Sequence, residues 1–368
     1  MLRLRARPGF ALLLASLLLV AFVGIAAVAL DFSRMYLFRT QLHTASDAAA
    51  LAGALRLMNG DAQGASDTAI AYGTSHLVEK ASATMVAADV VPGTWDFTSS
   101  TFTPAPGANW FASENNAVEA TARYVAPFTF GRFFGYTTRN RSATSIAALG
   151  SIGATDCVRP WAIPYASMLQ LLYPGSTPPV TYDLTAADVT RLRSMTMANQ
   201  ILLKVGDASA SPLPGAFYGV RLPPVRYADG SPGNPGGGAS RYRDAIGAPC
   251  SALQQPVGTG DWLQAEQGNM VGPTRDGTAT LCGIGGNPQS FTCSPPVPVK
   301  IALWDISDHS VASPNAFRVK YIGAFYVTGF SKGTGGSVDG VTGYFQSLVT
   351  LGSFNPEPGP LPKPALVR

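Results

Sequence analysis

The sequence predicts an α+β protein. A single N-terminal transmembrane helix continues into a long helix packed on an antiparallel sheet, and a second, β-rich, disulfide-containing domain follows. Three observations support this prediction. An uncharged apolar run covers residues 10–30, a helical apolar period continues from it to residue 57, and an alternating apolar–polar pattern begins at residue 84. All four cysteines lie beyond residue 150.

The composition narrows the class of protein. Only 13% of the 368 residues are charged, and the chain contains 39 glycines and 29 prolines. This composition argues against a coiled coil, a charged disordered protein and a polytopic membrane protein. The net charge of +4 includes three arginines that precede the apolar run, so the remainder is almost neutral. Because no basic stripe is present, we expect no nucleic-acid partner.

The apolar run predicts one membrane span. Its 21 residues would form a helix of about 31 Å, which matches the hydrocarbon thickness of a bilayer. Arg3, Arg5 and Arg7 lie before it, so residues 1–9 should form a cytoplasmic basic tail and the rest should be exported. The alternative is a cleaved signal peptide with a site at residues 27–29. Since the run exceeds the usual 7–15 residues of a signal peptide, we favour a retained anchor.

The anchor should continue as a helix from residue 31 to the turn dipeptide Asn59-Gly60, because no proline interrupts the segment. Small and apolar residues recur on one face at about 3.5-residue spacing, among them Leu42, Ala45, Ala49 and Ala52. Such a thin face would allow another subunit's helix to approach closely. The alternative interpretation is a surface helix of good intrinsic propensity.

The rest of the first module, residues 31–150, should place this helix on a sheet. A second helix is expected within residues 61–80, and strands with turns are expected from residue 84 to residue 148. The apolar sheet face facing the helix would contain the valines Val86, Val90, Val118 and Val125.

A specific motif lies where the anchor meets the helix. Leu30-Asp31 is followed by Arg34, Tyr36, Arg39, Leu42 and Ala45, and then by Asp47 and the run Ala-Ala-Ala-Leu-Ala-Gly-Ala. This segment resembles the TadE/TadG-like proteins of Flp (tight adherence, type IVb) pilus assembly. The resemblance is dense over residues 7–57. It is looser around residues 95–97, 116–118, 143–148 and 266–274.

The resemblance implies a single-span, pilin-like component of a pilus assembly or secretion machine in the bacterial inner membrane. It implies other pilus-assembly or pilin-like subunits as partners, with homo- or hetero-oligomers formed through the N-terminal helix. Processed type IV pilins carry a glutamate where this chain has Leu14, which argues against use as the major subunit. Some family members carry an Asp-x-Ser-x-Ser metal site. The corresponding segment here, residues 305–309, has His309 in place of the second serine, and we interpret it as a loop after a strand.

The second domain, residues 151–352, should begin after a short linker at residues 150–154 and end before a proline-rich, extended tail at residues 353–368. Strands are expected at residues 300–304, 316–329 and 340–351. One or two helices are expected within residues 184–203, and a flexible loop at residues 231–240.

The four cysteines, Cys157, Cys250, Cys282 and Cys293, predict disulfides in an oxidising compartment. Three pairings are open. The short Gly/Pro-rich loop favours Cys282–Cys293, which leaves Cys157–Cys250. A zinc site is the alternative, but it would require closer C-x₂₋₄-C spacing.

No catalytic, cofactor or metal residues are predicted. Nucleophile-elbow, zinc-protease and phosphate-loop motifs are absent from the sequence, so we expect a protein that is not an enzyme and has no cofactor. The most distinctive polar segment is residues 266–274. Glu266, Asn269 and Pro273 form a candidate contact loop there, and a structured turn is the alternative interpretation.

The functional hypothesis is a membrane-anchored, pilin-like accessory component of a Flp/Tad-type pilus or secretion machine, acting through helix packing and protein contacts. The alternative is a membrane-tethered exported binding or adhesin module. An exported enzyme of unrecognised type is the third hypothesis.

Overall fold

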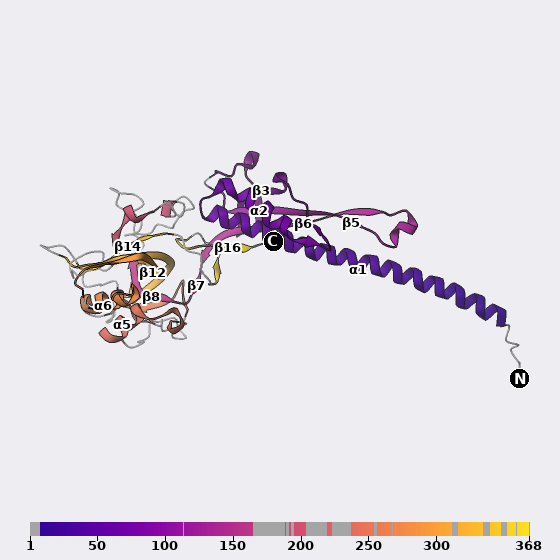
Figure 1. The fold of residues 1–368 in the computed structure, drawn as a ribbon. Coiled ribbons are helices and arrows are strands. Elements are labelled where there is room, and N and C mark those ends of the chain that lie inside the picture. The colour runs from indigo at the N-terminus through magenta and orange to yellow at the C-terminus, as the bar shows by residue number, and fades with distance from the viewer. Residues whose placement is uncertain are drawn as a thin grey trace, which may run out of the picture.

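A computed structural model contains two regions, each built around a six-stranded sheet (Figure 1). It describes residues 8–164 except 113, then residues 188, 191, 192, 195–203 and 219–222. It also describes residues 237–367 except 254, 255, 267, 269, 287, 311–315, 334–338, 347–351 and 358. The α+β class, the long N-terminal helix and the antiparallel sheet of the first region are confirmed.

Helix α1 (Pro8–Met58) is continuous over 51 residues and projects far beyond the rest of the molecule (Figure 1). It ends at Asn59-Gly60, as the turn dipeptide predicts. Gly60 takes the left-handed conformation with φ of 76°, which a side-chain-bearing residue rarely adopts. Asp61 then caps α2 (Ala62–Ser75) by accepting a hydrogen bond from the Gly64 N–H at 2.9 Å. Helix α2 therefore turns back and packs on the C-terminal half of α1.

The first sheet has the order β15-β6-β5-β3-β4, with β16 also paired to β6. Its strands are β3 (Val90–Asp96), β4 (Thr101–Pro104), β5 (Ala117–Pro127), β6 (Thr138–Ile152), β15 (Phe354–Asn355) and β16 (Pro362–Leu366). All of the pairings are antiparallel. The small hairpin β1 (Leu77–Val78) and β2 (Ala81–Ser82) leads into it. Short 3₁₀ turns occur at residues 87–89, 106–108 and 131–134.

The core between α1 and this sheet is built from small side chains. Alanines on α1 face alanines on β5 and β6, and the fully buried set is Ala45, Ala49, Ala50, Ala54, Ala120, Ala122, Ala126 and Ala147. Small residues on both layers bring the helix axis close to the sheet. Larger residues fill the two ends of this contact, including Phe38 and Met58.

Two parts of the predicted core face are wrong. Val90 and Val118 are buried as predicted, but Val86 and Val125 are more than half exposed. On α1, Phe32 is exposed, whereas Phe38 is buried. The packed face of a straight helix drifts away from a 3.5-residue repeat, because an ideal helix has 3.6 residues per turn.

The second sheet has the order β8-β12-β13-β14-β9, with β11 added on β13. Its strands are β8 (Val158–Pro164), β9 (Ile201–Leu202), β11 (Trp262–Gln264), β12 (Phe291–Ser310), β13 (Ala316–Ser331) and β14 (Gly340–Phe345). The predicted strands near residues 300, 316 and 340 therefore share one sheet. The pair β8–β12 is parallel and the others are antiparallel.

Two helices, α5 (Ala239–Gly247) and α6 (Val271–Leu281), pack on one face of this sheet. Neither helix was expected from the sequence, so the second region is more mixed than the predicted β-rich domain. Tyr242 and Ile246 of α5 are buried against Trp161, Ile301 and Phe325. The helices predicted within residues 184–203 and the loop at residues 231–240 lie largely outside the described residues.

The sequence predicts a linker at residues 150–154, and the structure contradicts it. Strand β6 continues to Ile152, and β7 (Ala154–Thr155) follows at once and pairs with β10 (Val257–Gly258). The predicted tail at residues 353–368 is extended, but it is not free: β15 and β16 return and pair with β6. Ile152 and Leu361 share a hydrophobic cluster with residues of the second sheet, so the regions meet at a packed junction.

The cysteines form two disulfides, Cys157–Cys250 and Cys282–Cys293, and none is free. The first bond links the start of the second region to the turn after α5. The second bond links the end of α6 to β12. Both bonds therefore attach the two unpredicted helices to the sheet beneath them.

Candidate functional site

The N-terminal half of α1 leaves the folded body and exposes its apolar side chains. From Leu12 to Leu30 no side chain is buried, and Leu12, Phe22 and Ile25 are at least two-thirds exposed. Among the described residues, α1 is the one helix long and apolar enough to cross a membrane. This half needs an apolar environment, because a continuous exposed apolar helix is not stable in water.

The exposed half ends at a carboxylate, Asp31, which is only 6% exposed. Asp31 accepts hydrogen bonds from the backbone N–H groups of Thr129, Phe130 and Gly131, at 2.9, 3.0 and 2.7 Å. These three residues begin the turn that joins β5 to β6. The single side chain thus pins the tip of the β5–β6 hairpin to α1, directly after the apolar run.

These contacts set the charge state of Asp31. Burial by itself would raise the pKa of the carboxyl group. The backbone donors of Thr129, Gly131 and Phe130, together with the Arg34 charge, outweigh burial and hold the pKa below its ordinary value. Asp31 is therefore ionised at neutral pH, which strengthens its three hydrogen bonds.

Arg34, one turn further along α1, adds further contacts between α1 and the hairpin tip. Its guanidinium pairs with Glu79 at 2.7 Å and donates a hydrogen bond to the Thr129 hydroxyl. The Glu79 backbone N–H in turn donates to the side-chain oxygen of Gln41 at 2.9 Å. The turn between β1 and β2 and the hairpin tip are thus both tied to α1 through polar side chains.

The predicted helix-packing residues Leu42, Ala45, Ala49 and Ala52 are buried, but by the chain itself. They face the module's own sheet and α2, and this face is not open to a second subunit. Asp47 of the same motif accepts a hydrogen bond from the Ser145 hydroxyl, which also contacts the Ser46 hydroxyl at 2.7 Å. The motif therefore joins α1 to β6 inside this module.

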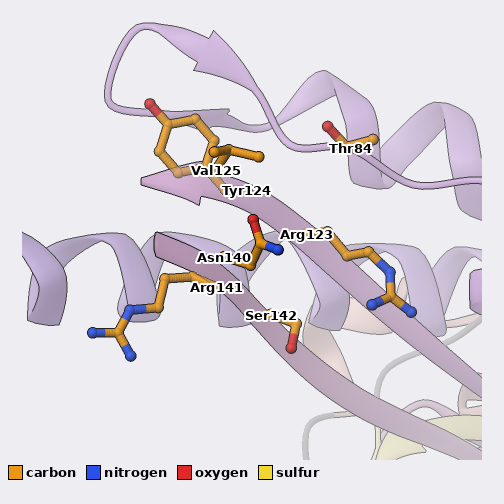
Figure 2. Close-up of a pocket in the computed structure, with 7 residues that line it drawn as sticks. All are labelled: Thr84, Arg123, Tyr124, Val125, Asn140, Arg141 and Ser142. Carbon is orange, nitrogen blue, oxygen red and sulfur yellow. The ribbon is translucent and has the colours of Figure 1, made fainter. Parts of the chain in front are cut away.

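An open recess of about 320 Å³ lies on the outer side of the β5–β6 hairpin. Its lining residues are Thr84, Arg123, Tyr124, Val125, Asn140, Arg141 and Ser142. Figure 2 shows the guanidinium groups of Arg123 and Arg141 at opposite ends of it. Arg123 pairs with the buried carboxylate of Asp89 at 2.6 Å, and this hydrogen bond raises the pKa of Arg123.

The recess does not bring a nucleophile and a base together. Its lining contains no carboxylate, thiol or imidazole, and Ser142 therefore has no base among these residues. In the part of the chain that the structure describes, no group of three His, Cys, Asp or Glu side chains could hold a metal ion.

The remaining predicted site residues are scattered. Arg3, Arg5 and Arg7 lie outside the described residues, as does Asn269. Glu266 is buried, with a carboxylate oxygen 3.6 Å from Nε of Arg221, and it accepts hydrogen bonds from the Gly238 N–H. Pro273 lies in the first turn of α6. Glu266 thus stabilises the fold and is not available as a contact residue.

The prediction of a loop at residues 305–309 is also wrong. Strand β12 continues to Ser310, and its carboxylates pair across to β13. Asp305 lies 3.3 Å from Lys320, and Asp308 lies 3.4 Å from Arg318. Sequence reasoning missed the role of Asp31, although its place directly after the apolar run was visible.

The fold and the contact between Asp31 and the β5–β6 turn define a class of protein. In this class, a long helix has an apolar half that anchors it in a membrane and a second half that packs on an antiparallel sheet. Two family models match this part of the chain. Residues 9–59 match a putative Flp pilus-assembly TadE/G-like family, and residues 52–147 match a putative Tad-like Flp pilus-assembly family. Residues 9–147 are thus similar to TadE/TadG-like Flp pilus-assembly proteins. No curated protein and no solved structure matches the chain.

Proposed function

We propose that the protein is a membrane-anchored accessory component of a Flp/Tad-type pilus assembly or secretion machine. The observation that carries this proposal is the family match over the anchor, α1 and the first sheet. The N-terminus lies in the cytoplasm, and both sheets lie on the outer side of the inner membrane. The three N-terminal arginines and the two disulfides support this orientation.

The contact with neighbouring subunits is made by the exposed half of α1. The alanine face from Leu42 to Ala52 is covered within the chain, whereas side chains from Leu12 to Leu30 are uncovered. Helices in a membrane associate through van der Waals packing of side chains that are not covered within their own chain. A deletion of residues 42–54 would not be a useful test of subunit packing. It would unfold the core, and the loss of a subunit contact could then not be distinguished from the loss of the fold.

Site-specific photocrosslinking in intact cells tests the proposed contact. Benzoylphenylalanine at the exposed positions Leu18 and Ile25 should give adducts with pilus-assembly proteins, identified by mass spectrometry. The same probe at Phe38, which is fully buried, is the matched control and should give none. If the exposed positions yield no protein adduct although the full chain is present in the membrane, the proposed assembly contact is wrong.

The orientation has its own test. An alkaline phosphatase domain fused after Arg368 should be active, and a cytoplasm-dependent reporter at the same place should be silent. The opposite pattern would contradict the orientation and leave the family assignment intact.

A further inference from the structure

The tip of the β5–β6 hairpin carries an exposed aromatic cluster. We define the aromatic tip as residues 128–136, with the sequence Phe-Thr-Phe-Gly-Arg-Phe-Phe-Gly-Tyr. Phe133, Phe134 and Tyr136 are 85%, 68% and 66% exposed. Three large aromatic side chains on one loop leave a substantial apolar surface with no cover in this chain.

The aromatic tip lies at a fixed level along α1. The Asp31 carboxylate holds the backbone of Thr129, Phe130 and Gly131 within hydrogen-bond distance. Asp31 is the first residue after the uncharged run that ends at Leu30. The tip is therefore placed where the spanning helix leaves the hydrocarbon core, within the roughly 5–7 Å headgroup layer on that side.

The hairpin also points the right way. Figure 1 shows β5 and β6 extending along α1 toward its N-terminal half, ahead of the rest of the first sheet. On α1 itself, Phe32 and Tyr36 are 71% and 74% exposed near the same level. Arg132, within the tip, is exposed as well. Aromatic rings with adjacent cationic groups are the side chains that favour a membrane–water interface.

We propose that the aromatic tip inserts into the interfacial layer of the phospholipid bilayer that α1 spans. Phe133, Phe134 and Tyr136 bury their rings among the headgroups and upper acyl chains, and Arg132 contacts lipid phosphates. The molecule then has two membrane attachments, α1 and the hairpin, joined by Asp31. Two attachments fix the tilt and rotation of the first sheet relative to the membrane.

A bilayer is the occupant that the geometry favours over a second protein. The tip is hydrogen-bonded to Asp31, the residue directly after the apolar run, so any membrane around α1 reaches it without a further binding event. The inference depends on the membrane anchor and not on the pilus role, so the two proposals can fail separately.

The test uses the full chain in phospholipid nanodiscs. Since all four cysteines are paired, one introduced cysteine is the unique thiol. Phe133→Cys carries an environment-sensitive fluorophore at the tip. Phe111→Cys is the matched control, because Phe111 is 71% exposed and precedes the far end of β5, about 30 Å or more away along the strand.

The label at position 133 should emit at shorter wavelength than the label at position 111, and nitroxide-labelled lipids should quench it. Dissolved iodide should instead quench the label at position 111 more strongly. Equal iodide quenching at both positions, with no lipid quenching at position 133, would overturn the proposal. Shielding at position 133 that persists in detergent and falls on dilution would also overturn it, because a second copy would then be the occupant.

Both labelled side chains are exposed, so neither substitution removes core packing. Asp31→Asn in the Phe133→Cys background supplies a second measurement: the lipid quenching at position 133 should fall. Unchanged quenching in that variant would show that Asp31 does not set the depth of the tip.

Discussion

Asp31 illustrates how one side chain acquires its role from three backbone groups distant in sequence. The N–H groups of Thr129, Phe130 and Gly131 would otherwise be unpaired at the start of a 3₁₀ turn. A carboxylate supplies the acceptors and the charge that this turn needs. Arg34 adds a second link to the same turn through Thr129. The contact between Asp31 and this turn is polar, although the segments on either side of it, the anchor and the aromatic tip, are apolar.

The first prediction concerns removal of this charge. Asp31→Asn removes the ionised acceptor and should release the hairpin tip, so trypsin at neutral pH should cleave after Arg132 faster than in the unsubstituted chain. Asp67→Asn, an exposed carboxylate on α2, is the matched control and should leave the cleavage rate unchanged. Equal cleavage rates for all three proteins would show that Asp31 does not hold the hairpin tip against α1.

The second prediction concerns pH. The folded pKa of Asp31 lies below its ordinary value of 3.8, so its stabilising contribution is complete above that value and is lost as the pH falls through the folded pKa. A nitroxide at position 133 should therefore become more mobile when the full chain in detergent is acidified below about pH 4. The same label in the Asp31→Asn variant should be mobile at both pH values; a transition of equal size there would assign the response to other groups.

At the scale of elements, the contact between α1 and α2 depends on small residues. Gly73 of α2 lies so close to α1 that an added Cβ would meet the Ala49 Cβ at 3.2 Å and the Met85 Cε at 2.7 Å. Gly53 is similarly close to Val118 and Ala69. The alanine-rich motif is thus needed to fit a helix, a second helix and a sheet into one thin core.

The third prediction follows from this close approach. Ala49→Leu should overpack the contact and destabilise the first module by about 1–3 kcal/mol. Thr44→Leu, an exposed position on the same helix, is the control and should change stability little. Thermal unfolding of the full chain in detergent measures both variants. A stable Ala49→Leu variant would mean that α1 and α2 separate easily.

At the scale of the whole molecule, the chain crosses between the two regions twice. Strand β6 leads through β7 into the second region, and β15 and β16 return to pair with β6 at the end of the chain. The junction is therefore closed from both directions. The Cys157–Cys250 bond lies at the entry to the second region and closes 93 residues, whereas Cys282–Cys293 closes 11.

The fourth prediction uses this difference in loop length. Replacing Cys157 and Cys250 together by serine should cost about 4–5 kcal/mol, and replacing Cys282 and Cys293 about 3 kcal/mol, if restriction of the unfolded chain dominates. Urea unfolding of the two double variants compares them directly. The reverse order would show that local packing around α6 outweighs loop entropy.

The sequence by itself determined the features that arise from local order. The anchor follows from an unbroken apolar run and the end of α1 from Asn59-Gly60. The alternating pattern predicted strands between residues 84 and 148 and near residues 300, 316 and 340, but not β8, β9, β11, β15 or β16. The TadE/TadG-like motif could be recognised in the sequence because its residues are contiguous on one helix. These features depend on neighbours within a few turns of chain, which a sequence displays directly.

Only the tertiary structure decided which partner each surface meets. It showed that the alanine face of α1 is covered by its own module, that Glu266 is buried against Arg221, and that residues 362–366 complete the first sheet. It also brought Asp31 to a turn about a hundred residues away. Each of these depends on groups distant in sequence that become neighbours only when burial and hydrogen bonding are satisfied over the whole fold.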